Sequence, residues 1–263
     1  MAYFTKQNAK IFYELYGDGE ECITLINGYT RSSSDFKLIG SFLAEGGKKV
    51  LCFDNRGSGR TESAVDFLVD DIVRDVTDLW DELDIAQSHV LGISMGGFIA
   101  QTLAIKVPER IISLCLVSTS VNVDYFPLRL EWPKEHEGIL NRLRAYFHPD
   151  FVQKNVLLIQ AMAKQIAKEN ENGIFEEKAK AQRMAILKSP LKEAYVARIK
   201  LPCLIIHGRE DSVTECKEAE KLHKLIEGSQ LYIYEKAGHL LLLEQKNDFY
   251  NRVHQFFSLG YKR

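Results

Sequence analysis

The sequence predicts an α/β fold with a mostly parallel, doubly wound sheet, and two observations carry this prediction. Short apolar runs typical of strands alternate with amphipathic helical patterns along most of the 263 residues. The central runs, such as Leu114–Val117, are continuously apolar, which is typical of strands covered by helices on both faces. Residues 121–191 interrupt the alternation, so we expect a core formed by residues 1–120 and 192–263 with a helical lid inserted between two of its strands.

The expected core elements follow in chain order. We expect strands at Ile11–Tyr16, Ile23–Asn27, Lys49–Asp54, His89–Gly92, Ser113–Ser118, Cys203–His207 and Gln230–Glu235. We expect helices at Phe36–Glu45, Phe67–Leu83, Gly97–Lys106, Cys216–Ile226 and Lys246–Ser258. The first two strands follow each other with few residues between them, which predicts a hairpin at one edge of the sheet.

Residues 121–191 contain helical patterns punctuated by prolines, at about Glu135–Phe147, Asp150–Glu169 and Ile174–Leu187. An insertion between sheet strands is expected over the carboxyl ends of the strands, where open α/β sheets bind ligands. We therefore expect this lid to form one wall of a pocket; the alternative is that its helices pack on the flank of the sheet. Its apolar side chains are expected to pack mainly on the sheet domain or on each other, and they include Tyr125, Phe126, Trp132, Leu140, Phe147, Phe151, Leu157, Leu158 and Met162.

The composition excludes several classes of function. With 34 basic and 36 acidic residues the net charge is −2, and no basic cluster stands out, so we expect no nucleic-acid partner. No apolar run approaches the ~20 residues of a membrane helix, and the N-terminus lacks a signal-peptide pattern, so we expect a cytoplasmic protein without a membrane partner. The five cysteines are odd in number and dispersed, which predicts reduced thiols. No His or Cys cluster has metal-ligand spacing, and we expect no metal and no cofactor.

The run His89–Gly97 carries the strongest functional signal. An apolar strand leads into Gly92-Ile93-Ser94-Met95-Gly96, and a helical pattern follows at once. A serine on such a tight strand-to-helix turn presents its hydroxyl to a pocket, and glycines at the flanking positions let the backbone pass close to itself. Ser94 is therefore the predicted nucleophile; the alternative is a glycine-rich turn with an incidental serine.

A serine nucleophile needs a base, and the base needs an orienting carboxylate. Asp211 lies three residues beyond Gly208, where an expected strand ends, and His239 follows Gly238 in the loop after the next strand. The predicted triad is therefore Ser94, Asp211 and His239. Glu210 and Asp124 remain alternative acids, and Asp211 has the alternative role of capping the helix that begins near Cys216.

The same chemistry needs donors for the developing oxyanion. We expect one from the backbone N–H of Met95, directly after the nucleophile. The second is expected from the backbone N–H of Tyr29, in the loop after Ile23–Asn27, where Gly28 lets the chain turn close to the pocket. An ordinary turn at the end of the strand is the alternative.

Together these residues resemble the α/β-hydrolase superfamily over the whole chain. The motifs resemble those of 3-oxoadipate enol-lactonases and small carboxylesterases, and the stretches around Asp211 and His239 are similar to methylesterases of polyketide products. The resemblance also rests on Asp54–Gly59, Asp70-Asp71, Gly92–Gln101 and Pro108–Arg110. It implies an α/β-hydrolase fold with the triad in the order Ser, Asp, His.

One position departs from the family pattern, because Asn27-Gly28 stands where the family usually has His-Gly. The histidine there is chiefly structural, so the resemblance implies an intact triad with an altered oxyanion loop or substrate head group. The family also implies structural roles for Asp54 and Arg56. The alternative for Arg56 is an ion pair with a substrate carboxylate.

These observations predict a serine hydrolase that cleaves a small or medium carboxylic ester or lactone through an acyl-serine intermediate. A carbon–carbon bond hydrolase and a cofactor-free perhydrolase use the same triad and stay open as alternatives. A non-catalytic ligand-binding member of the fold is an alternative of another class. The expected partner is the small-molecule substrate, and both a monomer and a homodimer remain open.

Overall fold

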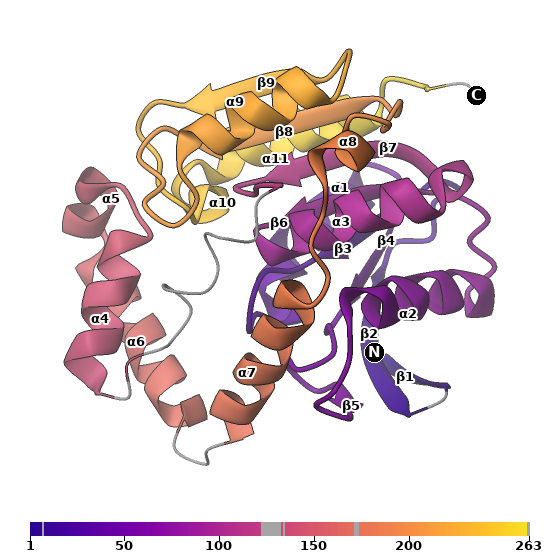
Figure 1. Cartoon of the computed structure of the whole chain (residues 1–263). Helices are drawn as coiled ribbons and strands as arrows, with labels where there is room; N and C mark the ends of the chain where they lie inside the picture. The colour runs from indigo at the N-terminus through magenta and orange to yellow at the C-terminus, as the bar shows by residue number, and fades with distance from the viewer. Residues whose placement is uncertain (7, 122–132, 134, 171–173, 262–263) are drawn as a thin grey trace.

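The structure is a computed structural model that describes residues 1–6, 8–121, 133, 135–170 and 174–261. A mixed sheet forms its centre, helices cover both faces of the sheet, and four further helices stand to one side (Figure 1). The predicted α/β fold with a mostly parallel sheet is confirmed.

Over the described residues the sheet has nine strands in the order β1-β2-β4-β3-β6-β7-β8-β9, and the short β5 pairs with β2. Neighbouring strands from β4 to β9 along this order are parallel, so their carboxyl ends meet at one edge of the sheet. The strands are β1 (Ala2–Lys6), β2 (Ala9–Tyr16), β3 (Cys22–Ile26), β4 (Lys49–Phe53), β5 (Glu62–Ser63), β6 (Ser88–Ile93), β7 (Ile111–Val117), β8 (Cys203–Gly208) and β9 (Gln230–Tyr234).

The sheet edge differs from the predicted one. We expected a hairpin between the first two predicted strands, but β4 lies between β2 and β3. The antiparallel hairpin is instead formed by β2 and the unpredicted β1, with Ala2 opposite Tyr13. The side chains of β1 are half-buried or exposed, so this strand lacks the continuous apolar run that marks the central strands.

Helices cover the two faces of the sheet around separate apolar cores. Along β7 the side chains alternate, so that Leu114 and Leu116 join one core whereas Cys115 and Val117 join the other. The first core is covered by α2 (Val69–Glu82), α3 (Met95–Lys106), α8 (Glu193–Val196) and α9 (Cys216–Leu225). The second is covered by α1 (Lys37–Glu45), α10 (Leu241–Glu244) and α11 (Lys246–Phe257), with the 3-10 turn η1 (Ser33–Phe36) before α1. The short η2 (Pro108–Arg110) leads into β7.

Four helices form the segment that we expected to be inserted, and we call them the cap helices: α4 (His136–Ala145), α5 (Pro149–Lys154), α6 (Val156–Asn170) and α7 (Ile174–Leu187). The predicted helix over Asp150–Glu169 is broken at Asn155, which ends α5 with a non-helical backbone of φ −125° and ψ 35°. α4, α5 and α6 lie together on the left of Figure 1, and α7 returns toward the core beside β5. α4 and α6 enclose a third apolar core that contains Leu143, Ile159 and Ala163.

The expectations for individual apolar residues of this segment have mixed outcomes. Leu140 and Phe147 are buried in the third core, and Phe151 and Met162 pack against it. Leu157 and Leu158 are 81% and 44% exposed, so these two are exceptions to the expectation that the apolar side chains of the segment mainly pack inside. The expectations for Tyr125, Phe126 and Trp132 lie outside the described residues.

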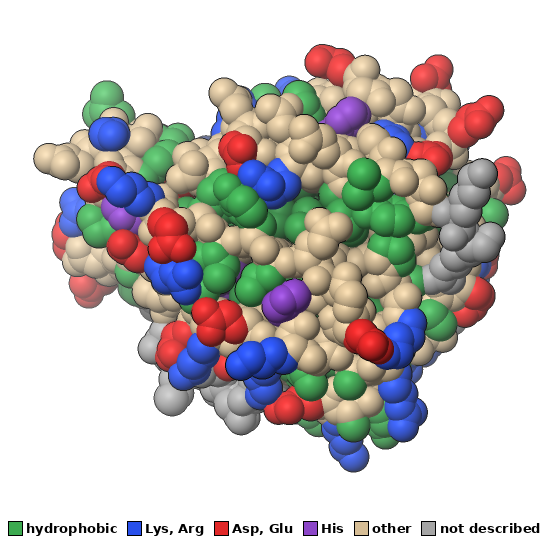
Figure 2. Space-filling view, turned by 90° about the horizontal axis from the view of Figure 1, so that it is seen from above, with side chains coloured by type: hydrophobic (Ala, Val, Ile, Leu, Met, Phe, Trp, Pro, Cys, Tyr) green, Lys and Arg blue, Asp and Glu red, His purple; other side chains and the backbone are tan. Residues whose placement is uncertain are grey.

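The chemistry of the surface and the thiols agrees with the composition. Cys22, Cys52, Cys115 and Cys203 are buried, Cys216 is half-buried, and all five are free thiols. Lys and Arg side chains are interspersed with Asp and Glu over the face seen in Figure 2, rather than gathered into a basic patch. Within the described ranges, none of the helices combines the length and apolar character needed to cross a bilayer.

Candidate active site

Ser94 lies on a strained turn between β6 and α3. Its backbone has φ 54° and ψ −117°, a region that residues with a side chain rarely adopt. A Cβ added to Gly92 would collide with the carbonyl of Gly96, and one added to Gly96 would collide with the carbonyl of Ile26. The glycines are therefore required by close backbone approach, as the sequence predicts.

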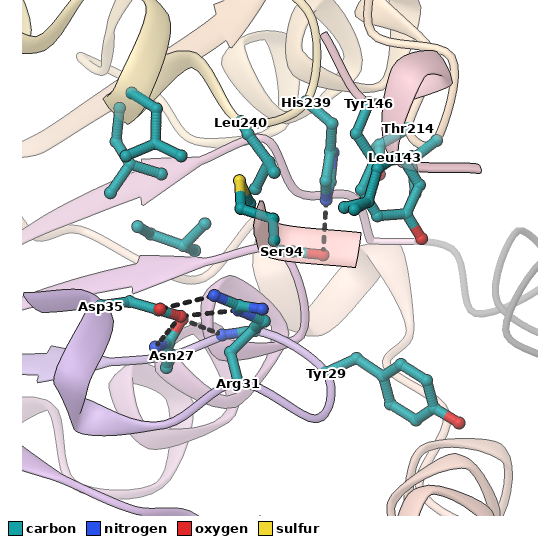
Figure 3. A pocket seen from close by; sticks show the side chains of 16 residues that line it. Asn27, Tyr29, Arg31, Asp35, Ser94, Leu143, Tyr146, Thr214, His239 and Leu240 are labelled. Atoms are coloured by element: carbon teal, nitrogen blue, oxygen red, sulfur yellow. Dashed lines mark hydrogen bonds and ion pairs between the residues drawn. The ribbon is translucent and has the colours of Figure 1, made fainter. Parts of the chain in front are cut away.

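The structure brings Ser94, His239 and Asp211 into one hydrogen-bonded chain. Nε2 of His239 lies 3.1 Å from Oγ of Ser94 (Figure 3). Nδ1 of His239 lies 2.8 Å from Oδ2 of Asp211. A carboxylate only accepts, so Nδ1 carries the hydrogen and Nε2 is left to accept from the serine hydroxyl. All three residues are buried, with 5–8% of their surface exposed. This arrangement can make the hydroxyl a nucleophile.

Asp211 is held in place by more than His239. Its Oδ1 accepts hydrogen bonds from the amides of Val213 (2.8 Å) and Thr214 (2.9 Å). The fully buried His207 places Nε2 3.3 Å from Oδ2 of Asp211 and 2.8 Å from the carbonyl of Thr214. Burial alone would raise the pKa of Asp211, but the neighbouring His239 and His207 hold it well below its usual range. The acid is therefore ionised and fixed in direction.

Glu210, one of the two alternative acids, is paired away from the imidazole of His239. The carboxylate of Glu210 is 49% exposed and pairs with His148 at 3.2 Å. Asp124 lies outside the described residues. Asp211 does accept from amides two and three residues further on, but these precede α9, which begins at Cys216. The structure therefore brings Asp211, not Glu210, to the imidazole.

The loop after β3 contains the second predicted oxyanion donor, and it passes directly beside the nucleophile. A Cβ on Gly28 would lie 3.4 Å from both the carbonyl of Ile93 and Cβ of Ser94. Met95 is the first residue of α3, so its amide has no acceptor within the helix. The structure thus places both Gly28 and the start of α3 next to Ser94.

Asn27 stabilises this loop. Its Oδ1 accepts from the amide of Gly28 (2.7 Å), and its Nδ2 donates to the carbonyl of Ser32 (2.6 Å) and to Oδ2 of Asp35 (3.1 Å). Asn55 donates in turn to the carbonyl of Asn27 (3.0 Å). Asn27 thus supports the loop through hydrogen bonds of its own.

Asp54 and Arg56 are both held by contacts within the protein, in agreement with structural roles. Asp54 is fully buried and accepts from the amides of Ser33 (2.6 Å) and Arg60 (2.7 Å). Arg56 forms a buried bidentate pair with Asp75 at 2.6 and 2.7 Å. The alternative in which Arg56 meets a substrate carboxylate is wrong, because its guanidinium is paired with Asp75 and does not line the pocket.

A pocket opens over Ser94, and the cap helices supply part of its wall. Leu143 and Tyr146 face it from this segment (Figure 3), and Met162 also lines it, so these helices do not lie on a remote flank of the sheet. Of the residues from Phe151 to Met162, Met162 lines the pocket. The remaining described lining residues are Asn27, Gly28, Tyr29, Arg31, Asp35, Ile93, Val213, Thr214, His239, Leu240, Leu242 and Leu243.

One ion pair lies in this mainly apolar wall. Arg31 donates to Asp35 from Nε at 2.6 Å and from Nη2 at 2.5 Å, beside the amide of Asn27 (Figure 3). The pairing of Arg31 with Asp35 was not predicted, although a spacing of four residues is typical of paired charges. A second omission is Glu244, which accepts from the amides of Gly238 (2.7 Å) and His148 (2.8 Å) and so links the histidine loop to the cap. Among the described residues, no group of three or more His, Cys, Asp or Glu side chains is arranged to hold a metal ion.

Comparisons with known proteins show the family and the fold of the chain. Residues 18–246 match the family model described as serine aminopeptidase, S33. The chain is 28% identical over 212 residues to 3-oxoadipate enol-lactonase 2 of Acinetobacter baylyi, covering 78% of this chain and 76% of that protein. It is 26% identical over 270 residues to the 2-hydroxy-6-oxononadienedioate/2-hydroxy-6-oxononatrienedioate hydrolase of Escherichia coli, covering 95% and 91%. A solved α/β hydrolase from a Medee basin deep-sea metagenome library has the same fold, with a TM-score of 0.89 at 20% identity over 100% of this chain and 99% of that one.

Proposed function

The chain belongs to the serine aminopeptidase S33 family of the α/β-hydrolase superfamily, and on that premise we propose that it cleaves a small or medium carboxylic ester or lactone through an acyl-serine intermediate. The observation that carries the proposal is the chain of contacts from Ser94 through His239 to Asp211, at 3.1 and 2.8 Å. The similarity to an enol-lactonase supports an ester or lactone as the scissile group.

In the proposed reaction, Oγ of Ser94 attacks the acyl carbon while its proton passes to Nε2 of His239. The imidazolium then gives this proton to the leaving alkoxide, which departs as the alcohol. Water attacks the acyl-serine with His239 as base, the carboxylic acid leaves, and the proton returns to Ser94. Asp211 keeps the imidazole in the required tautomer and compensates its charge.

The amides of Met95 and Tyr29 are the proposed donors to the oxyanion that forms at each tetrahedral step. Donors fixed before the reaction stabilise this charge without having to reorganise, which is commonly the largest contribution to such catalysis. The closeness of both segments to Ser94 supports the assignment.

We propose that the cap helices act as a lid over the acyl group. Leu143 and Met162 give this wall its apolar character, and an apolar wall excludes water from the oxyanion. Compact apolar acyl or aryl groups fit such a wall better than long lipid chains, which need an open groove.

A carbon–carbon bond hydrolase is the second candidate, because the named substrate of the Escherichia coli relative is a 2-hydroxy-6-oxo compound rather than an ester, and that relative aligns over 95% of the chain. One panel separates the candidates: chromogenic esters of increasing acyl length, an enol-lactone, a vinylogous diketone and an aminoacyl anilide. We expect the esters and the lactone to be turned over at least about tenfold faster than the diketone and the anilide. Faster turnover of the diketone would assign the second candidate, and faster turnover of the anilide would assign an aminopeptidase.

A further inference from the structure

A buried glutamine of the cap connects two loops of the core. Gln182 on α7 is fully buried, and both ends of its amide are paired with backbone groups. Its Oε1 accepts from the amide of Thr30 at 2.8 Å, and its Nε2 donates to the carbonyl of Arg56 at 2.8 Å. A buried amide with both ends satisfied fixes the segments that it joins, because releasing either one leaves a polar group unpaired.

The first of these loops contains Tyr29. The amides on either side of that of Tyr29 are both tied to side-chain oxygens, Gly28 to Asn27 (2.7 Å) and Thr30 to Gln182 (2.8 Å). The carbonyl of Gly28, in the same peptide plane as the Tyr29 amide, accepts from the amide of Arg31 (3.2 Å). Thr30 also has φ 62°, a conformation that needs support from its surroundings in a residue other than glycine.

The second loop lies equally close to α7. A Cβ on Gly57 would approach Cγ of Gln182 to 2.9 Å and the carbonyl of Lys178 to 3.0 Å. Lys178, one turn before Gln182, donates to the carbonyl of Gly59 at 3.1 Å. Lys178 therefore docks α7 on the second loop, whereas Gln182 contacts both loops.

From this geometry we infer that Gln182 is a positioning residue for the oxyanion hole, because it holds the peptide planes around Tyr29. The inference rests on the proposed function. The side chain does not touch the substrate; it acts through the amide of Thr30. Without Gln182, the N–H of Tyr29 is no longer held in one direction. The transition state, in which the oxyanion forms, then loses stabilisation, whereas the binding of the uncharged substrate does not.

The test uses Gln182→Met, which is similar in size and removes both hydrogen bonds, and Gln182→Glu, which keeps the acceptor for Thr30. For a short-chain ester we expect Gln182→Met to lower kcat about tenfold with KM within about threefold. The affinity for a trifluoromethyl ketone, whose serine adduct carries an oxyanion, should fall by the same factor. The affinity for the corresponding unreactive secondary alcohol should not change. Gln182→Glu should recover part of the ketone affinity.

The matched control is Lys178→Met on the same helix, which weakens docking without touching the Tyr29 loop. We expect it to lower the melting temperature but to leave kcat and ketone affinity within about twofold. Equal losses in Lys178→Met and Gln182→Met, or unchanged kcat and ketone affinity in Gln182→Met, would overturn the inference. If the wild-type protein hydrolyses no ester and Ser94 takes no fluorophosphonate label, the proposed function itself has failed. If Gln182→Met does not fold, the same two affinities are measured for Gln182→Glu. A loss of ketone affinity with unchanged alcohol affinity would support the inference, and unchanged affinity for both would overturn it.

Discussion

The backbone amide of His239 donates a 2.8 Å hydrogen bond to the carbonyl of Tyr146, just beyond the end of α4. The amide of Leu240 donates to the same carbonyl at 3.2 Å, and the hydroxyl of Ser212, next to Asp211, donates to the carbonyl of Ala145 at 2.5 Å. The last carbonyls of a helix need such partners. Here the loops of the proposed base and acid supply them, so any lid opening has to leave the α4 end in place or disturb the triad.

The first prediction concerns the nucleophile. A fluorophosphonate probe should label the protein once, at Ser94, because the proposed base His239 lies 3.1 Å from its hydroxyl. Ser94→Ala should abolish labelling and lower ester turnover below about 10⁻³ of the wild-type rate. Intact-mass and peptide mass spectrometry locate the label. Label on another serine, or turnover above that limit, would contradict the assignment of Ser94.

The second prediction concerns the acid. Asp211→Asn should lower kcat by about 10³- to 10⁴-fold with little loss of fold, because an amide favours the wrong tautomer of His239. Glu210→Gln is the matched control, since Glu210 is adjacent in sequence but pairs with His148 at the surface. Its kcat should stay within about threefold of the wild-type value. The roles have to be exchanged if steady-state kinetics show the larger loss in Glu210→Gln.

Much of the core and the three triad candidates could be predicted because their signals are local. The strand before Ser94 and the helix after it have distinct periodicities, and Asp211 and His239 each follow a strand end. Parallel strands bring their carboxyl ends to one edge, so order along the chain was enough to expect the three together. The weak point was the sheet edge, where pairing between β2 and β4 depends on contacts that periodicity does not encode.

The supports of the site could not be predicted in the same way. Gln182 and Thr30 are 152 positions apart, and His148 and Glu244 are 96 apart. Nothing in the local pattern around Gln182 or Glu244, which both lie in helices, indicates which distant amide each one meets. Such contacts follow from tertiary packing, whereas the residues that they support are marked by the turn and strand in which they lie.

The third prediction concerns substrate charge. Asp35 neutralises Arg31 in the pocket wall through two hydrogen bonds of 2.5 and 2.6 Å. Asp35→Asn removes this compensation, so the guanidinium can attract an anionic acyl group. We expect the ratio of kcat/KM for a p-nitrophenyl succinate monoester to that for p-nitrophenyl butyrate to rise about tenfold.

The control for this prediction is the double variant Asp35→Asn with Arg31→Gln, in which the cation is also absent. The ratio should return to within about threefold of the wild-type value. Equal changes for the two esters in Asp35→Asn would mean that the pair only supports the loop through Asn27 and does not set charge preference.

The last prediction concerns Glu244, which joins the histidine loop to the cap. Burial raises the pKa of this carboxyl above its ordinary 4.5, although hydrogen bonds from the amides of His148 and Gly238 act in the opposite direction. A raised pKa in the folded state means that the folded protein binds the proton more tightly than the unfolded chain. Its contribution to stability is therefore fully present below pH 4.5 and is lost as the pH rises through the folded-state pKa.

Glu244→Gln removes this titration, so the melting temperature of the wild type minus that of the variant should decrease as the pH rises from about 4 to 8. His148 and Asp211, the charged groups that face Glu244, are present in both proteins. Glu177→Gln, at an exposed position of α7, is the matched control and should give a smaller pH dependence. A difference that grows with pH would show that the two amides stabilise the ionised carboxylate more than burial opposes it, and the sign of the pKa shift would then be reversed.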